Sequence, residues 1–378
     1  MKQAKEAATD GSWKNFYPVL GSRASMGKTG ASARWIFMFP MSVNIVEQTY
    51  QQPLQDYITD KIHRLEFFAP WKGYDYVQRV ISKKGPLNSL YFGCDYSKMD
   101  QHFNLYHALE CYDVIKCYFK PQYWPGLKES IEYTFNCDVV GPDGLISGPH
   151  AMPSGSGWTN FLETVFNFIV KIYLDLKYHL FSSPVASAMG IGDDQIYMFP
   201  VYYNIEPLTK LIVSVFVALG LEANVEKQEV SHSIISFLQR RSFDFWSPYG
   251  IQYAGVYPTF RALTSLVYPE FYHNEKIWNT RTFALRCLMI LENCVNHPLF
   301  EEFCKFIADG NSNIKEFATL PDAEILLTRH MAKKIANFIP TYNQEKANSD
   351  PIKFESLKII RQYVLERSEE RRVGKECR

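Results

Sequence analysis

Two apolar runs separated by a Gly-Asp-Asp turn constrain the fold of this chain more than any other feature. Val185–Ile191 and Gln195–Phe199 flank the tripeptide at 192–194. Short apolar runs joined by a tight, glycine-containing turn are typical of a β-hairpin. The sequence therefore predicts a hairpin that carries two carboxylates, Asp193 and Asp194, at its tip.

A third carboxylate follows another predicted strand. Ser89–Cys94 is a short apolar run, which indicates a buried strand, and Asp95 comes directly after it. If this strand lies beside the hairpin, Asp95, Asp193 and Asp194 converge. Like charges at that separation repel, and hard divalent cations with oxygen ligands stabilise them. We therefore expect these three aspartates to bind Mg²⁺, with Mn²⁺ as an alternative. Two such ions, about 3.5–4 Å apart, can assist phosphoryl transfer.

Composition excludes several other classes of protein. The chain has 378 residues, enough for two to three domains or one large multi-lobed unit, and is 47% hydrophobic and 21% charged. It contains 40 basic and 40 acidic residues, which excludes a protein held on nucleic acid or membrane by its bulk charge but leaves room for a local basic channel. No apolar run approaches the ~18 residues of a membrane span, and the first twelve residues contain no secretory signal core.

The eight cysteines form no Cys-x-x-Cys pair and no zinc pattern with closely spaced histidines. We interpret them as free thiols in a reducing compartment.

The last twelve residues, Arg367–Arg378, follow no apolar period. They resemble the in-frame translation of a sequencing adapter, so we interpret them as an artefact tail rather than part of the fold. A disordered charged tail is the alternative. A reading frame that ends in this way also suggests a partial gene, in which Met1 need not be the true start.

The remaining pattern interleaves strands and helices and then becomes helical. Residues 53–86 have a helical pattern, broken at Pro70 and Gly73. A glycine- and proline-rich loop covers 141–157, and a helix is expected from about Trp158 to Leu176. Further helical patterns cover about 206–220 and 275–365, with short strands around 234–256. These elements predict an α+β core with a helical C-terminal part.

Three segments in order resemble the motifs of viral RNA-dependent RNA polymerases. Asp95-Tyr-Ser-Lys-Met-Asp100 resembles motif A, Ser154-Gly-Ser-Gly-Trp-Thr159 with the following residues to Asn167 resembles motif B, and Gly192-Asp-Asp194 resembles motif C. Each lies on the kind of element that the family uses. The Thr-Asn-x-x-Glu-Thr variant of motif B is most similar to picobirnavirus-like enzymes, with partitivirus-like enzymes as a second choice.

The resemblance implies roles for individual residues. Asp95 and Asp193 would be metal ligands, with Asp194 as a supporting carboxylate, and Asp100 would contact the ribose of the incoming nucleotide. Ser154 and Gly155 would give the motif B loop mobility and a close backbone approach. Many relatives have an asparagine where this chain has Glu163, which leaves the partner of Asp100 open between two neighbours, Thr159 and Asn160.

Upstream, residues 21–29 contain a glycine-flanked segment that ends in Lys28 and Thr29. A Walker A loop needs four residues between its glycines, and this segment has five, so a P-loop is the weaker alternative. The resemblance favours motif F, in which Lys28 and Arg34 would neutralise the nucleotide triphosphate.

Three basic residues lie after motif C. Lys227 matches the motif D lysine, which in the family can protonate pyrophosphate. Arg240 and Arg241 lie in a segment that resembles motif E, where basic side chains would contact RNA phosphates.

The implied fold is an N-terminally incomplete right-hand polymerase of the α+β class, with fingers, a palm built on a small antiparallel sheet, and a helical thumb. The expected boundaries are 1–88 for partial fingers, 89–272 for the palm with a fingers insertion at about 119–150, 273–366 for the thumb and 367–378 for the artefact tail.

The implied function is Mg²⁺-dependent, RNA-directed RNA synthesis for a viral genome, expected to be double-stranded RNA. The expected partners are template and nascent RNA, ribonucleoside triphosphates and a capsid protein, in the host cytoplasm or virion interior. Three alternatives remain open: a reverse transcriptase-like polymerase, a P-loop NTPase, and a catalytically silent RNA-binding relative of the polymerases.

Overall fold

The structure is a computed structural model that describes residues 1–27, 30–61, 65–201, 203–267, 278–335, 338 and 350–376, without the side chains of 23–34 and 369–376. The chain divides into two compact units. The first comprises Met1–Lys72 and Lys83–Phe237, and the second comprises Gly73–Ser82 and Leu238–Arg378. The expected boundary at 272/273 lies outside the described residues. The boundaries expected between fingers, palm and thumb therefore stay predictions.

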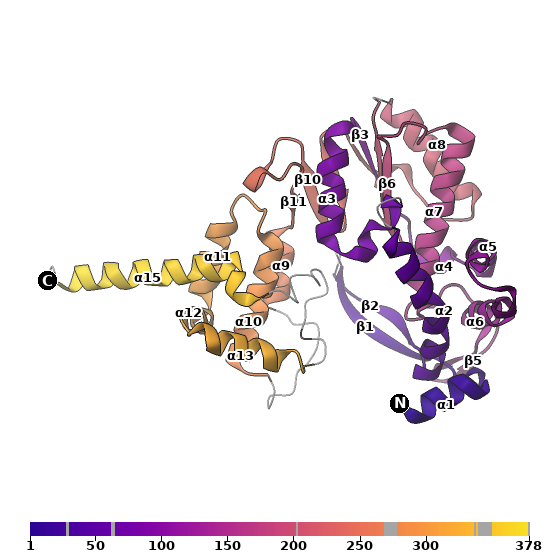
Figure 1. Cartoon of the computed structure of the whole chain (residues 1–378), viewed down its shortest axis with the longest axis horizontal. Helices are drawn as coiled ribbons and strands as arrows, with labels where there is room; N and C mark the ends of the chain where they lie inside the picture. The colour runs from indigo at the N-terminus through magenta and orange to yellow at the C-terminus, as the bar shows by residue number, and fades with distance from the viewer. Residues whose placement is uncertain are drawn as a thin grey trace. The chain divides into compact units, whose positions relative to one another are not determined.

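A four-stranded antiparallel sheet forms the centre of the first unit (Figure 1). Its strand order is β6-β7-β3-β8, with bounds β3 (Leu90–Cys94), β6 (Ser187–Ile191), β7 (Asp194–Phe199) and β8 (Glu229–Ser231). Every residue of β3 is buried, which explains why its sequence is a continuous apolar run. The predicted hairpin and the predicted strand before Asp95 are both confirmed, and β3 pairs directly with β7.

A second sheet joins two segments that are distant in sequence. Its order is β2-β1-β4-β5, with bounds β1 (Val19–Gly27), β2 (Gly30–Met38), β4 (Val139–Gly141) and β5 (Gly144–Ile146). Strands β1 and β2 form an antiparallel hairpin, and β1 meets β4 in parallel at Val19 and Val140. The two stretches that the sequence assigns to the fingers thus share one sheet.

Helices pack around these sheets. They are α1 (Lys2–Asp10), α2 (Met41–Asp60), α4 (Met99–His102), α5 (Leu105–Ile115), α6 (Trp124–Asn136), α7 (Trp158–Tyr178) and α8 (Ile205–Ala218). The 3₁₀ segment η2 (Glu66–Lys72) packs on β6. If Gly190 on β6 carried a Cβ atom, that atom would lie only 2.6 Å from the ring of Phe67. Close approach of this ring therefore requires glycine on β6. Strand β9 (Ile234–Phe237) ends the unit.

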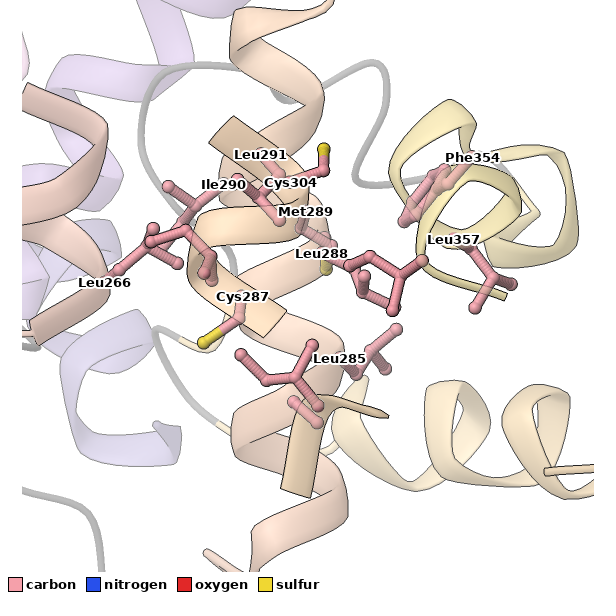
Figure 2. Packing of buried hydrophobic residues seen from close by; sticks show 14 of the residues in the cluster. Leu266, Leu285, Cys287, Leu288, Met289, Ile290, Leu291, Cys304, Phe354 and Leu357 are labelled. Atoms are coloured by element: carbon pink, nitrogen blue, oxygen red, sulfur yellow. The ribbon is translucent and has the colours of Figure 1, made fainter. Parts of the chain in front are cut away.

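The second unit is mostly helical, as the sequence predicts. Helix α3 (Tyr74–Lys84) belongs to this unit as far as Ser82. The other elements of the unit are β10 (Arg240–Phe243), β11 (Gly255–Val256), α9 (Thr259–Val267), α10 (Thr280–Leu291), α11 (Phe300–Gly310), α12 (Ser312–Ala318), α13 (Asp322–Ala332) and α15 (Glu355–Glu376). Its core is built around α10: Figure 2 shows Leu285, Leu288 and Met289 of this helix with Phe354 and Leu357. The continuous burial of α10 explains its nearly unbroken apolar sequence.

Three further expectations can be compared with the described residues. Helix α15 continues to Glu376, and Arg367 hydrogen-bonds to Asp309, while the interpretation of 367–378 as an artefact tail stays a prediction. The seven cysteines in the described part of the chain are free thiols, and only Cys117 among them is exposed. Among the described helices, none has both the length and the apolar character needed to span a membrane.

We predict that Leu288→Ala will lower the free energy of unfolding of the second unit by about 2–5 kcal/mol, because Leu288 is fully buried and its truncation leaves a cavity. The control is Leu327→Ala on α13, where the side chain is 61% exposed and about 0.5 kcal/mol or less is expected. Chemical denaturation followed by circular dichroism compares the two. Equal losses would contradict the packing described here.

Candidate active site

The pairing of β3 with β7 brings the motif A and motif C carboxylates to one edge of the central sheet. Cys94 is opposite Gln195, so the register places Asp95 beside Asp194, and Ile191 pairs with Asp194 to close the hairpin. Burial raises the pKa of the Cys94 thiol well above its usual value, and the negative charges of Asp194 and Asp95 add to this shift. The carboxylates of Asp95 and Asp194 therefore lie near the same buried thiol.

The hairpin turn is fixed by helix α7. Gly192 has a φ of 56°, which favours glycine. Its N–H donates to Thr164 Oγ1 (2.8 Å), and its carbonyl accepts from Asn167 Nδ2 (2.6 Å). Thr164 and Asn167 are three residues apart and therefore lie on one face of the helix. Both polar groups of the glycine that precedes Asp193 are thus held by buried side chains of motif B.

A buried chain of hydrogen bonds joins the same helix to motifs A and C. Tyr96 donates its hydroxyl to Asn167 Oδ1 (3.0 Å) and accepts from Gln195 Nε2 (2.8 Å), while Gln195 Oε1 accepts from Tyr197 (3.0 Å). Burial raises the pKa of Tyr96 and of Tyr197 well above the usual value, so both remain hydroxyl donors. A fully satisfied buried network of this kind makes the arrangement of its members rigid.

The side chain that contacts Asp100 in the structure is Ser154. The hydroxyl of Ser154 donates to this carboxylate, and the carboxyl group of Glu163 lies near it. Burial raises the pKa of Glu163 to about 10, and the hydrogen bond and charge of Asp100 add to the shift. Burial and the neighbouring carboxylate thus favour the neutral form of Glu163.

The two residues expected at Asp100 have other positions. Thr159 donates its hydroxyl to the carbonyl of Pro153 (3.1 Å), which fixes the loop before α7. The amide of Asn160 faces Gly192, where an added Cβ would lie 3.1 Å from Nδ2. Sequence spacing alone does not show which turn of α7 faces Asp100. In the structure it is the turn with Glu163, one turn after Thr159 and Asn160.

The motif B loop adds to the edge of strand β2. The N–H of Phe37 donates to the carbonyl of Ser154 (3.0 Å). Gly155 has a φ of 128°, and a Cβ there would overlap the carbonyl oxygen of Phe37. The close backbone approach predicted for Gly155 is thus present, and it is made to β2.

Two consecutive residues attach the motif D turn to motif A. Lys227 donates to the hydroxyl of Ser97 (2.8 Å), so its ammonium lies beside the motif A segment. The amide of Gln228 donates to the carbonyl of Asp95 (2.8 Å) and accepts from the N–H of Asp95 (3.1 Å). The backbone of this aspartate is therefore fixed from both sides by one side chain. Nothing in the sequence pattern distinguishes Gln228 from any polar turn residue.

Arg240, predicted to contact RNA, is buried in the structure, and the contact stays untested. In the second unit its side chain is only 5% exposed and donates to the carbonyl and Oδ1 of Asn293 (2.7 and 3.2 Å). Its guanidinium also lies over the rings of Tyr74 and Tyr257, 4.2 and 5.1 Å from their centroids. Arg240 thus stabilises the interior of this unit, whereas Arg241 is exposed.

The two residues predicted for motif F are not both described. Lys28 lies outside the described residues. The backbone of Arg34 lies on β2, where it pairs with Arg23, and the position of its side chain is also outside the description.

Asp95 and Asp193 are exposed and Asp194 is half-buried, so all three offer oxygen ligands of the type that Mg²⁺ prefers. Within the described residues, no three or more His, Cys, Asp or Glu side chains are grouped closely enough to hold a metal ion. The chemistry of the donors fits a divalent cation, and the convergence of all three carboxylates at one metal site stays a prediction.

Comparison with known proteins identifies similar viral polymerases. The chain is 31% identical, over 313 residues, to the curated "Potential RNA-dependent RNA polymerase" of Human picobirnavirus (strain Human/Thailand/Hy005102/-). The alignment covers 78% of this chain and 54% of that protein, so the chain spans about half the length of its curated relative. In sequence and in fold, the chain is picobirnavirus polymerase-like. No protein-family model matches it.

Two solved structures share the right-hand polymerase fold. The crystal structure of the RNA-dependent RNA polymerase of a human picobirnavirus superposes with a TM-score of 0.77 at 25% identity, covering 92% of this chain and 66% of that one. Its insertion loop deletion mutant gives a TM-score of 0.75 at 24% identity, covering 92% and 64%. The predicted fold class is therefore confirmed.

We predict that Asn167→Leu will destabilise the first unit by about 1–3 kcal/mol, because the carbonyl of Gly192 and the hydroxyl of Tyr96 lose a buried partner. Hydrogen exchange across residues 187–199 will become faster. Asn136→Leu, at an exposed position on α6, is the control. Unchanged exchange in the Asn167 variant would show that α7 does not fix the hairpin turn.

Proposed function

We propose that this chain is the catalytic part of an RNA-directed RNA polymerase. It would transfer ribonucleoside monophosphates to the 3′ end of RNA under the direction of an RNA template. The observation that carries the proposal is the junction of motifs A and C at one sheet edge, with the turn before Asp193 fixed by α7. The polymerase-like sequence and fold support the same assignment.

Asp95, Asp193 and Asp194 would hold Mg²⁺, or Mn²⁺ as the alternative. When bound, the cations would polarise the phosphate oxygens and stabilise the charge that develops on the attacking and leaving oxygens. The protein's own contribution is to present the carboxylates on a rigid frame. Gln228 fixes the backbone of Asp95, and the contacts to Gly192 fix the residue before Asp193. Such preorganised groups need little rearrangement during the reaction.

Other residues would bind the nucleotide and complete the proton transfer. Lys227, beside Ser97, is our candidate for protonating the pyrophosphate leaving group. Lys28 and Arg34 would neutralise the triphosphate, and Arg241 would contact the phosphates of RNA. A viral double-stranded RNA genome, a capsid protein partner, and a site of action in the host cytoplasm or virion interior are the finer parts of this proposal.

We predict that Asp193→Ala will lower template-directed ribonucleotide incorporation at least about 10³-fold, because several kcal/mol of charge stabilisation depend on the bound cation. Primer extension on a defined RNA template with Mg²⁺ measures it. Asp143→Ala is the matched control, since Asp143 is an exposed aspartate in the turn between β4 and β5. Equal activity of the two folded variants would overturn the assigned role of Asp193. If the wild-type chain shows no templated incorporation, the polymerase assignment for this chain is overturned.

A second prediction concerns the sugar. Asp100→Ala will reduce the preference for ribonucleotides over deoxyribonucleotides by about 10-fold or more, because the site loses a polar group able to recognise the 2′-hydroxyl. Ser154→Ala, which removes the hydroxyl bound to Asp100, will shift the preference in the same direction by a smaller amount. The ratio of kcat/KM for each nucleotide pair is the measurement. An unchanged ratio would contradict the proposed contact with ribose.

A further inference from the structure

Glu47 is a buried carboxylate that the sequence gives no reason to notice. It lies in the middle of α2, and its side chain is fully buried. Its Oε1 accepts from the hydroxyl of Ser156 (2.6 Å), and its Oε2 accepts from the N–H of Gly157 (2.7 Å). Thr134 on α6 is a more distant donor at 3.4 Å. The carboxylate therefore binds the motif B loop where it enters α7.

The surroundings of Glu47 suit an ionised group that titrates near neutrality. Burial raises its pKa to about 7, and the donors from Ser156, Gly157 and Thr134 limit the rise. The titratable groups that face it are Tyr133 and Cys137, whose pKa values are both raised by burial and which therefore remain neutral. The N-terminal end of α7 also favours a negative charge, because the helix dipole is positive there.

The loop is attached on its opposite side as well. Ser154 accepts a hydrogen bond from the backbone of Phe37, and its hydroxyl donates to Asp100. Gly157 is too close to Glu47 for a side chain, since a Cβ would lie 2.9 Å from Oε2. The segment from Ser154 to Gly157 is thus held between β2 and α2, and the contact with Asp100 is made from within it.

We propose that Glu47 is a positioning residue for the nucleotide site, which sets the place of Ser154 and hence of Asp100 by anchoring the start of α7. This inference rests on the proposed polymerase function. Thr164 and Asn167 bind Gly192 farther along the helix, so the frame of the catalytic carboxylates does not use this anchor. Loss of the anchor therefore affects nucleotide binding more than the chemical step.

The test compares Glu47→Gln with Glu129→Gln, which removes an exposed carboxylate from α6 in the same unit. Glutamine keeps the shape of Glu47 but presents one amide N–H₂ to two donors. We expect the KM for ribonucleotides to rise about 10-fold in Glu47→Gln, since a charge-assisted hydrogen bond is lost, with kcat within about 3-fold of wild type. Ser156→Ala should raise KM in the same direction, and Glu129→Gln should not.

The pH profile separates positioning from general stability. Wild-type KM should rise as the pH falls below about 7, because protonation of Glu47 weakens the anchor. The Glu47→Gln variant should lack this component and show a raised KM throughout. A kcat loss with unchanged KM, or the same pH profile in both proteins, would overturn the proposal.

Hydrogen exchange of residues 152–160 tests the anchor without any activity. Exchange should become faster in Glu47→Gln and stay unchanged in Glu129→Gln, in samples whose circular dichroism matches wild type. If the wild-type chain incorporates no nucleotide, the polymerase assignment fails, and this comparison still decides the anchor. Unaltered exchange at Gly157 and Trp158 in Glu47→Gln would overturn it.

Discussion

The candidate site depends on the contact between helix α7 and the turn that precedes Asp193. Gly192 has no side chain, so its position can be fixed only through its backbone, and Thr164 and Asn167 bind both of its polar groups. Asn167 also accepts from Tyr96, which follows Asp95 directly. One helix thereby relates two carboxylate-bearing segments that are almost 100 residues apart in sequence. Without this contact, the polar groups of Gly192 and the hydroxyl of Tyr96 would lose their partners on α7.

The parts of the fold that sequence could predict are those with a local signal. The run Leu90–Cys94 is apolar throughout because it forms a central strand, and the Gly-Asp turn of the β6–β7 hairpin needs a positive φ at Gly192. Helix α7 was also predictable, since its apolar residues recur with helical spacing. The start of helix α2, by contrast, could not be predicted from the sequence. The helical pattern begins near residue 53 in the sequence, yet the helix begins at Met41 and continues through Pro53, because packing of its buried side chains outweighs the local preference.

The residues of the candidate site also divide into those that the sequence reveals and those that only the fold reveals. The three aspartates were recognisable from their order along the chain, but their partners depend on tertiary contacts that no spacing rule contains. Arg240 and Arg241 are adjacent and chemically identical, and only the fold shows that the first is buried against Asn293. A weak signal did exist on α7, where polar residues Glu163, Thr164 and Asn167 interrupt an otherwise apolar face. For Glu47 and Gln228 the sequence contained no comparable signal.

The two hydrogen bonds between Gln228 and Asp95 span 133 residues and have a consequence for how the protein is made. Asp95, Asp193 and Asp194 all precede Gln228 in the sequence, so a nascent chain contains these carboxylates before Gln228 is synthesised. In that interval the backbone of Asp95 lacks the amide that fixes it in the finished protein. The contacts of Gln228 with Asp95, and the pairing of β3 with the last strand of the central sheet, β8 (Glu229–Ser231), can form only after this later segment has been synthesised. A chain released before that point would lack the amide that fixes the backbone of Asp95.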